Sequence, residues 1–210
     1  MARARVPEKL TKGRQTRQRI VERAAALFNT RGVAGASMAD VSEATGLEKG
    51  GVYNHFETKE ALALAAFDYS AGLVHGRIEA AAASETLPLR KLRAMIDVYR
   101  RVPENPFVAG GCPLLNAAVD ADDTNPPLRN RVRRAMDHWR RIMAGVLRDA
   151  VVARDLPPID VEATADALIA TMEGGVMLAR LYGNAIHMHR AADHIVGYID
   201  ALAERAAVVS

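Results

Sequence analysis

The sequence predicts an all-α protein of about nine helices, with a three-helix amino-terminal head followed by a helical bundle. Apolar residues recur at helical spacing through most of the chain, and Pro, Gly and Asn separate the helical stretches. No stretch alternates apolar and polar residues well enough to indicate a strand. The 210 residues, half of them hydrophobic, suffice for one core or for a small domain on a larger one. We divide the chain into residues 1–57, with a basic tail at 1–13, and residues 58–210.

The first predicted helix, residues 13–31, has one apolar face and a strongly basic start. Its apolar residues recur at helical spacing and are Ile20, Val21, Ala24, Leu27 and Phe28. Residues 1–31 hold nine Lys or Arg against two Glu, a net charge of +7, whereas residues 61–210 carry a net charge of −1. A basic end on a nearly neutral body is the electrostatic footprint of phosphate binding. The alternative is a charged tail that only aids solubility.

Residues 37–59 predict two short helices around a tight turn. Ser37 is placed to cap the first of them, and Asp40 lies three residues later at the positive helix end. Gly46 ends this helix where a left-handed residue is needed. The second helix, residues 48–55, is short and rich in glycine, so its apolar residues must anchor it to neighbouring helices. Its opposite side is small, polar and flat, and consists of Lys49, Gly50, Gly51, Tyr53 and Asn54.

A longer pattern joins these features into one motif. It runs through Leu27-Phe28, Arg31-Gly32, Ser37, Val41, Gly46, Gly50, Val52-Tyr53, His55-Phe56 and Lys59-Glu60-Ala61-Leu62. Over residues 14–60 this pattern resembles the DNA-binding domain of the tetracycline-repressor (TetR) family of bacterial one-component regulators. The run GGVYNHFETKEAL with its upstream partner helix makes the resemblance specific, while the rest of the chain matches only in its helical layout.

The resemblance implies a DNA-binding role for eight residues of the head. These are Ser37, Lys49, Gly50, Gly51, Tyr53, Asn54, His55 and Lys59. Tyr53 would lie against the sugar-phosphate wall or a thymine methyl, and Lys49 would reach base edges or a phosphate. His55 and Lys59 would bind phosphates, with a packed histidine and a solvated lysine as the alternatives. Gly51 departs from the Ser, Thr or Ala more usual in the family, which leaves few long side chains to read bases.

The body is predicted to hold six helices. One over about 58–83 links the head to the bundle, and Pro88 opens the next. The others are expected at 112–121, between Asn125-Pro126-Pro127 and Pro157-Pro158, at about 161–182 and at about 190–207. We interpret Asp120, Asp122 and Asp123 as solvated loop and helix-start charges rather than as a calcium site.

A ligand site is expected between the helices of the body. Such sites are mostly apolar with a few directed polar groups. The residues that we expect to line it are Met95, Tyr99, Phe107, Cys112, Leu115, Asn116, Trp139, Met143, Met172 and Glu173. Core packing is the alternative for each, least so for Trp139 and Asn116, because a buried indole N–H or amide needs a partner. Glu173 lies in an apolar helix and would face a cavity, a partner subunit or water.

Cys112 is the only cysteine and follows two glycines at an expected helix start. The dipole of a helix amino terminus lowers the pKa of a thiol, so a reactive switch at Cys112 is one hypothesis, and it resembles a cysteine sensor in a subset of the family. A small buried residue that packs near the pocket is the alternative.

The resemblance implies a regulator of transcription, most often a repressor, that a small molecule releases from DNA. One short recognition helix cannot select a genomic site alone, so a homodimer should bind a palindromic operator in double-stranded DNA. We expect the last two helices to form the dimer surface, with internal core as the alternative for their apolar residues. These are Val161, Ala165, Leu168, Ile169, Met172, Gly175, Val176, Ala179, Ile195, Ile199 and Leu202.

Other classes of protein fit the sequence less well. His187 and His189 are two residues apart and would point to different sides of a helix, and no CxxC or HExxH spacing occurs, so we expect no metal and no cofactor. No catalytic set stands out; an all-helical enzyme and a helical adaptor without a DNA role are the rival classes. One cysteine fits a reducing cytoplasm. No apolar run is long enough for a membrane span, and the basic start lacks the apolar segment of a signal peptide.

Overall fold

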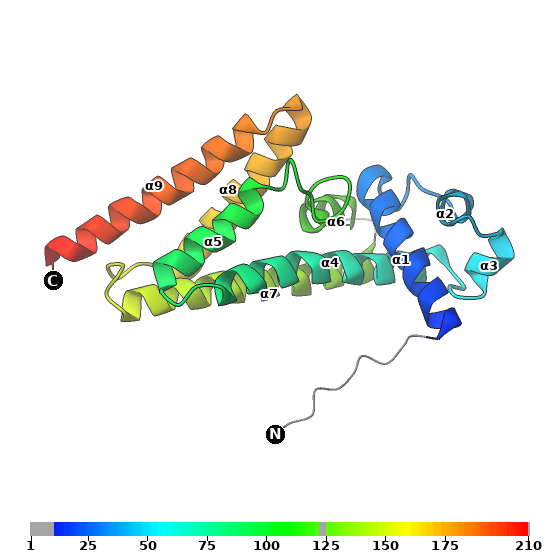
Figure 1. Cartoon of the computed structure of the whole chain (residues 1–210), viewed down its shortest axis with the longest axis horizontal. Helices are drawn as coiled ribbons and strands as arrows, with labels where there is room; N and C mark the ends of the chain where they lie inside the picture. The colour runs from blue at the N-terminus through cyan, green and yellow to red at the C-terminus, as the bar shows by residue number, and fades with distance from the viewer. Residues whose placement is uncertain (1–10, 122–124, 210) are drawn as a thin grey trace, which may run out of the picture.

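The computed structural model describes residues 11–121 and 125–209, and within these ranges the chain forms nine helices and no strand (Figure 1). The helices are α1 Lys12–Arg31, α2 Met38–Thr45, α3 Lys49–Tyr53, α4 Lys59–Ala83, α5 Pro88–Arg100, α6 Pro113–Ala121, α7 Pro126–Val152, α8 Val161–Tyr182 and α9 Ile186–Val209. The all-α prediction is confirmed. Two predicted bounds were wrong: α3 is shorter than residues 48–55, and α9 begins at Ile186 rather than near residue 190. None of the described helices combines the length and apolar character that crossing a bilayer requires.

Short polar side chains cap the amino-terminal ends of three long helices of the body. Thr58 accepts a hydrogen bond from the Ala61 N–H at 3.1 Å and begins α4. Asn125 and Asp160 cap α7 and α8 in the same way. These caps satisfy backbone donors that no intrahelical carbonyl can reach.

The head consists of α1, α2 and α3 and has its own apolar core at one end of the molecule (Figure 1). Ile20 of α1, Val41 of α2 and Val52 of α3 are each fully buried there. Phe56, which follows α3, is 4 % exposed, and the guanidinium of Arg17 lies over its ring at 4.5 Å. The apolar anchors therefore hold the short α3 against α2 and the core of the head, as its weak intrinsic helicity requires.

The linking helix α4 contributes to two cores. Its first turns bury Leu62 and Ala66 in the core of the head, and its later turns bury Phe67, Val74 and Ile78 in the core of the body. The packing therefore changes between Ala66 and Phe67, after the boundary that we placed at residues 57 and 58.

The body packs α4 to α9 around one apolar core. In Figure 1, α4 and α7 run side by side along one edge of the body, and α8 and α9 pack together on the opposite side. Trp139 of α7 and Tyr99 of α5 are fully buried and stack with their ring centroids 4.7 Å apart. A Cβ at Gly175 of α8 would lie 2.8 Å from Cβ of Ala191, so glycine is what lets α8 and α9 come this close.

The structure corrects the set of residues that we expected at the dimer surface. Ten of them are buried within the protomer: Ala165, Leu168, Ile169, Met172, Gly175, Val176, Ala179, Ile195, Ile199 and Leu202. Val161 is half-buried. Because these residues form the inner face of α8 and α9, any contact with a second copy must use the outer face.

Substitution of two glycines of the head by alanine should change the unfolding free energy in opposite directions. Gly46 has φ +67°, a left-handed conformation that disfavours a Cβ, so Gly46→Ala should cost about 1–2 kcal/mol of unfolding free energy. Gly50 lies in α3 with open space around it, so Gly50→Ala should raise the unfolding free energy by about 0.5–1 kcal/mol. Urea denaturation of the two variants measures both values, and equal signs would contradict the assigned conformations.

Candidate functional site

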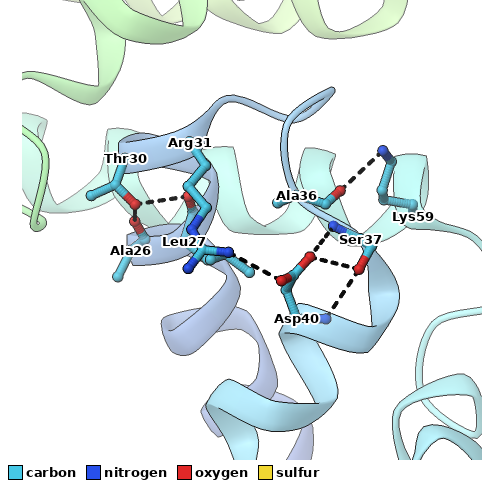
Figure 2. Close-up of polar contacts among 8 residues, drawn as sticks. All are labelled: Ala26, Leu27, Thr30, Arg31, Ala36, Ser37, Asp40 and Lys59. Atoms are coloured by element: carbon cyan, nitrogen blue, oxygen red, sulfur yellow. Dashed lines mark hydrogen bonds and ion pairs between the residues drawn. The ribbon is translucent and has the colours of Figure 1, made fainter.

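A capping box fixes the start of α2 beside the end of α1 (Figure 2). The Ser37 hydroxyl accepts from the Asp40 N–H at 3.2 Å, and Asp40 Oδ2 accepts from the Ser37 N–H at 2.7 Å. Arg31 Nη1 lies 3.0 Å from Asp40 Oδ1. The hydrogen bond from the Ser37 hydroxyl, the one from its N–H, and the charge of Arg31 hold the pKa of Asp40 below its ordinary value. The cap predicted from Ser37 and Asp40 is confirmed, and the Ser37 hydroxyl is used within the protein.

Lys59 is turned toward the loop between α1 and α2 (Figure 2). Its ammonium donates to the carbonyls of Val33 at 2.9 Å and Ala36 at 3.1 Å. Two of the three N–H donors of Lys59 are therefore used within the protein. The third N–H donor of Lys59 remains for the phosphate contact that we predicted, and this contact stays a prediction.

One side of α3 is exposed and carries few large side chains. Lys49, Gly50 and Asn54 are exposed, and Tyr53 is 39 % exposed. Lys49 Nζ lies 5.8 Å from the centroid of the Tyr53 ring, within the range of a cation–π contact. The backbone at Gly50 and the half-buried Gly51 can approach another surface closely. The ammonium of Lys49 and the ring of Tyr53 lie beside these two glycines.

The partly buried His55 follows this face and donates its backbone N–H to the Val52 carbonyl at 3.0 Å. Exposed arginines of α1, Arg14, Arg17 and Arg19, add positive charge to the same small head. A short exposed helix with small residues, one cation and one aromatic ring fits the width of a DNA major groove, which admits an α-helix.

Two asparagines join the head to the body. Asn116 of α6 donates from Nδ2 to Asn29 Oδ1 at 2.9 Å and to the Gly110 carbonyl at 2.8 Å. Asn29 of α1 donates to the Ala109 carbonyl at 2.9 Å. Gly110 has φ +107°, and a Cβ there would lie 2.6 Å from the Asn29 carbonyl oxygen. The loop before α6 therefore needs glycine at residue 110 to reach α1.

An acidic residue adds a second link between α6 and the head. Asp120 Oδ2 accepts from the Val33 N–H at 2.9 Å, just after the end of α1. A Cβ at Gly32 would lie 3.0 Å from Asp120 Oδ1. Asp120 thus has a structural partner, which corrects its interpretation as a solvated loop charge. Asp122 and Asp123 lie outside the described residues.

The structure divides the predicted ligand residues between two places. Eight of them are buried in the core of the body: Met95, Tyr99, Phe107, Cys112, Trp139, Met143, Met172 and Glu173. The other two, Leu115 and Asn116, line a cavity between the head and the body. The prediction that these ten residues line one ligand site stays a prediction, and the structure places them in two separate regions.

Three polar groups meet inside the core of the body. Glu173 Oε1 accepts from Cys112 Sγ at 3.0 Å and from the Tyr99 hydroxyl at 3.2 Å. Glu173 Oε2 and Trp139 Nε1 are buried without a hydrogen-bond partner among the described residues. Burial raises the pKa of Glu173 to about 7.

The pKa predicted for Cys112 had the wrong direction. Cys112 is 1 % exposed, and its burial, together with the charge of Glu173, raises the pKa of the thiol well above its ordinary value. Burial and a neighbouring carboxylate outweigh the helix dipole that we expected to lower the pKa. A buried neutral thiol is a poor nucleophile, so the structure supports the packing role of Cys112.

Sequence patterns gave no signal for three residues at this junction. Asn29 is one polar residue in an amphipathic helix, and Arg180, which lies near Asn29 at a cavity between the head and the body, is one cation near the end of another helix. Asp120 drew attention only as part of an acidic cluster. Their roles depend on contacts with residues far away in the chain, and no local spacing predicts such contacts.

The head and its exposed α3 define a helix-turn-helix regulator of transcription. Residues 20–66 match the model of the bacterial regulatory proteins of the tetR family, and residues 88–195 match the tetracyclin repressor-like C-terminal domain. The chain belongs to the tetracycline-repressor family. Its relatives are transcriptional regulators and not enzymes.

Solved structures and sequence relatives agree with this assignment. A TetR transcriptional regulator from Chloroflexus aurantiacus J-10-FL is 45% identical with a TM-score of 0.88, covering 91% of this chain and 97% of that one. A TetR-family regulator from Cytophaga hutchinsonii is 33% identical with a TM-score of 0.83, covering 93% and 98%. An HTH-type transcriptional regulator of Mycobacterium tuberculosis (strain CDC 1551 / Oshkosh) is 29% identical over 171 residues, 79% of this chain and 84% of its own length.

The buried carboxyl group predicts a pH-dependent stability. The folded-state pKa of Glu173 is about 7 against an ordinary 4.5, so between these values the folded protein keeps a proton that the unfolded chain has lost. Stability therefore falls as the pH rises from about 4.5 to 7 and stays lower above 7, by about 3 kcal/mol at most. Glu173→Gln, which cannot ionise, should stabilise the protein at pH 8 and much less at pH 5.

Urea unfolding at both pH values and at one protein concentration measures this difference. Glu204→Gln, a change at an exposed residue of α9, is the matched control and should have no such effect. An equal change in stability at pH 5 and pH 8 would show that Glu173 does not titrate between them.

Proposed function

We propose that this chain is a repressor that binds a palindromic operator as a homodimer and that a small molecule releases. The observation that carries the proposal is the exposed face of α3. The head that presents this face is connected to the body by hydrogen bonds between α6 and α1. An HTH-type transcriptional repressor from Mycobacterium sp. (strain GP1), 24% identical over 172 residues, supports the repressing role. It is matched over 80% of this chain and 84% of its own length. In the cytoplasm, such a protein would occupy its operator until its ligand accumulates.

α3 would enter the major groove with its glycine-bearing side against the bases. Lys49, Tyr53 and Asn54 are the exposed side chains with the reach to contact base edges or the groove wall. His55 and the arginines at the start of α1 would contact phosphates. With about 6–10 phosphate contacts per dimer, affinity would fall about 10³–10⁵-fold between 50 and 200 mM salt.

The outer face of α8 would form the centre of the dimer. Its outward residues alternate at spacings of four and three and are Ala163, Ala167, Ala170, Gly174, Met177 and Leu181. Leu181 is 72% exposed and Tyr182 is 65% exposed in the protomer. Such a stripe of small and apolar residues packs against a second helix as in a coiled coil. Tyr198 of α9, 44% exposed, would extend this surface.

Ligand binding in the body would change the spacing of the two heads. The body acts on the head through α4, which packs in both cores, and through the contact of Asn116 with Asn29. A typical coupling free energy of about 1–3 kcal/mol would change operator affinity about 5–150-fold.

Selection of bound sequences from random duplexes tests the proposal as a whole. We expect an enriched palindrome, because two α3 helices related by a two-fold axis read the same half-site. A screen for small molecules that release the protein from this duplex then tests the regulation. Enrichment of an asymmetric sequence, or of none, would contradict the proposal.

Lys49→Ala should weaken binding to the selected duplex at least about 10-fold, because the dimer loses two groove contacts of about 1–3 kcal/mol each. Lys91→Ala is the matched control, since Lys91 lies on α5 of the body. Fluorescence anisotropy at one fixed salt concentration compares the two variants. Equal affinity of Lys49→Ala and the unchanged protein would remove Lys49 from the interface.

Leu181→Arg should convert the dimer to a monomer, because it places one unpaired cation from each protomer in an apolar interface. Val152→Arg, at the end of α7, is the matched control, since Val152 is 78% exposed and lies outside the proposed surface. Sedimentation equilibrium should show a monomer for Leu181→Arg and a dimer for Val152→Arg. A stable Leu181→Arg dimer would place the interface elsewhere.

A further inference from the structure

A cavity of about 410 Å³ lies between the head and the body. Phe28, Asn29 and Val33 line it from the head, and Leu115 and Leu128 line it from the body. Ala63, Ala66 and Phe67 of α4 lie along its wall, where α4 passes from one core to the other. This volume falls within the range of small-molecule sites in proteins, about 300–1,000 Å³.

The walls of the cavity are mainly apolar, and one cation stands beside them. Arg180 of α8 lines the cavity, and its exposed guanidinium makes no hydrogen bond or ion pair with any described residue. Its side chain packs over the loop before α6, since a Cβ at Gly111 would lie 3.0 Å from Arg180 Nη1. A guanidinium without a protein partner is a ready site for a carboxylate, which it can bind with two hydrogen bonds.

The other polar groups of the cavity already have partners in the protein. The side-chain amide N–H groups of Asn29 and Asn116 donate to oxygens at the junction. The carboxylate of Asp120 accepts from the Val33 N–H, which turns it toward the head. Ser70 donates to the Ala66 carbonyl within α4. Arg180 is therefore the group best placed to select a charged ligand.

We propose that this cavity binds a small amphipathic carboxylate that acts as the effector. Its apolar part packs against Phe28, Phe67 and Leu128, and its carboxylate pairs with Arg180. The inference rests on the proposed function, to which it adds the place and the chemical class of the ligand. An occupant touches α1 of the head and α6 of the body at once, so it acts directly on the hydrogen-bonded junction between them.

The core of the body offers less room for the same ligand. Tyr99, Trp139 and Met143 are fully buried and pack on one another or on their neighbours in one core. The carboxylate of Glu173 in that core disfavours a second carboxylate. The cavity at the junction also holds a carboxylate, that of Asp120, but the Val33 N–H donates to it and the cation Arg180 lines the same cavity. The positive charge of Arg180 therefore favours the junction as the site for an anionic ligand.

Calorimetric titration of the full chain with octanoate, decanoate and 4-phenylbutyrate tests the site without DNA. We expect at least one of these carboxylates to bind, and octan-1-ol and octylamine to bind more weakly than octanoate. Arg180→Met keeps the length of the side chain but removes its charge, and it should raise the dissociation constant about 10-fold. Arg90→Met, at an exposed residue of α5, is the matched control and should bind like the unchanged protein.

A second variant tests the cavity itself. Ala117→Phe adds a ring to the cavity wall and should also weaken binding, while a thermal melt confirms that the variant folds. No binding of any probe at millimolar concentration would overturn the inference. Binding that Glu173→Gln changes and that Arg180→Met and Ala117→Phe leave unchanged would overturn it too, because the ligand would then lie in the core.

A separate measurement distinguishes failure of this inference from failure of the proposed function. A protein that binds carboxylates through Arg180 but no duplex would disprove operator binding and leave the cavity assignment intact. A protein that binds its selected duplex but no carboxylate probe would disprove only the effector class. The carboxylate that binds most tightly should release the duplex from the unchanged protein at lower concentration than from Arg180→Met.

Discussion

The contact of Asn116 with Asn29 is the constraint on which the arrangement of head and body depends. One side-chain amide of α6 reaches the backbone carbonyl of Asn29 at 3.1 Å, its side-chain oxygen at 2.9 Å and the Gly110 carbonyl at 2.8 Å. These hydrogen bonds are partly shielded from water, so a displacement of either partner would leave a polar group without a hydrogen bond. That cost holds Asn116 and Asn29 in place relative to each other. A side chain at residue 110 would collide with the Asn29 carbonyl. These hydrogen bonds therefore help to fix the direction of α1, and with it the position of α3, relative to α6.

One helical turn connects this junction to the buried polar cluster. The Asn116 N–H donates to the Cys112 carbonyl at 3.1 Å, and the thiol of Cys112 donates to Glu173. α6 thus has the junction on one side and the core of the body on the other, while α4 packs in both cores. Coupling between two sites needs an element whose position both sites influence. α6 meets that condition because it contacts both the junction with the head and the core of the body.

Local chemistry made much of the fold predictable, and tertiary packing accounts for what was wrong. The cap at Ser37 and the left-handed Gly46 depend on neighbouring residues, so the sequence contained them. The apolar residues of α8 that we expected at a dimer surface lie on its inner face, and the sequence did not reveal this because small and apolar residues occur on both sides of this helix. The thiol of Cys112 depends on burial and on Glu173, which lies 61 residues away in the chain. The cavity at the junction combines residues from five helices and has no signature in any one of them.

In the proposed complex, the small side chains of α3 would make operator selectivity depend more on the geometry of the dimer. Contacts with phosphates supply affinity and carry no direct sequence information. Only three exposed side chains of this face are long enough to read a half-site: Lys49, Tyr53 and Asn54. The two glycines, Gly50 and Gly51, only allow the backbone to come close to the DNA. Selectivity in the proposed complex must then come largely from the fixed spacing of two half-sites and from the shape of the DNA between them. In this proposal, a change at the junction would alter that spacing without touching a base-reading side chain, so a ligand there would act on the main source of selectivity.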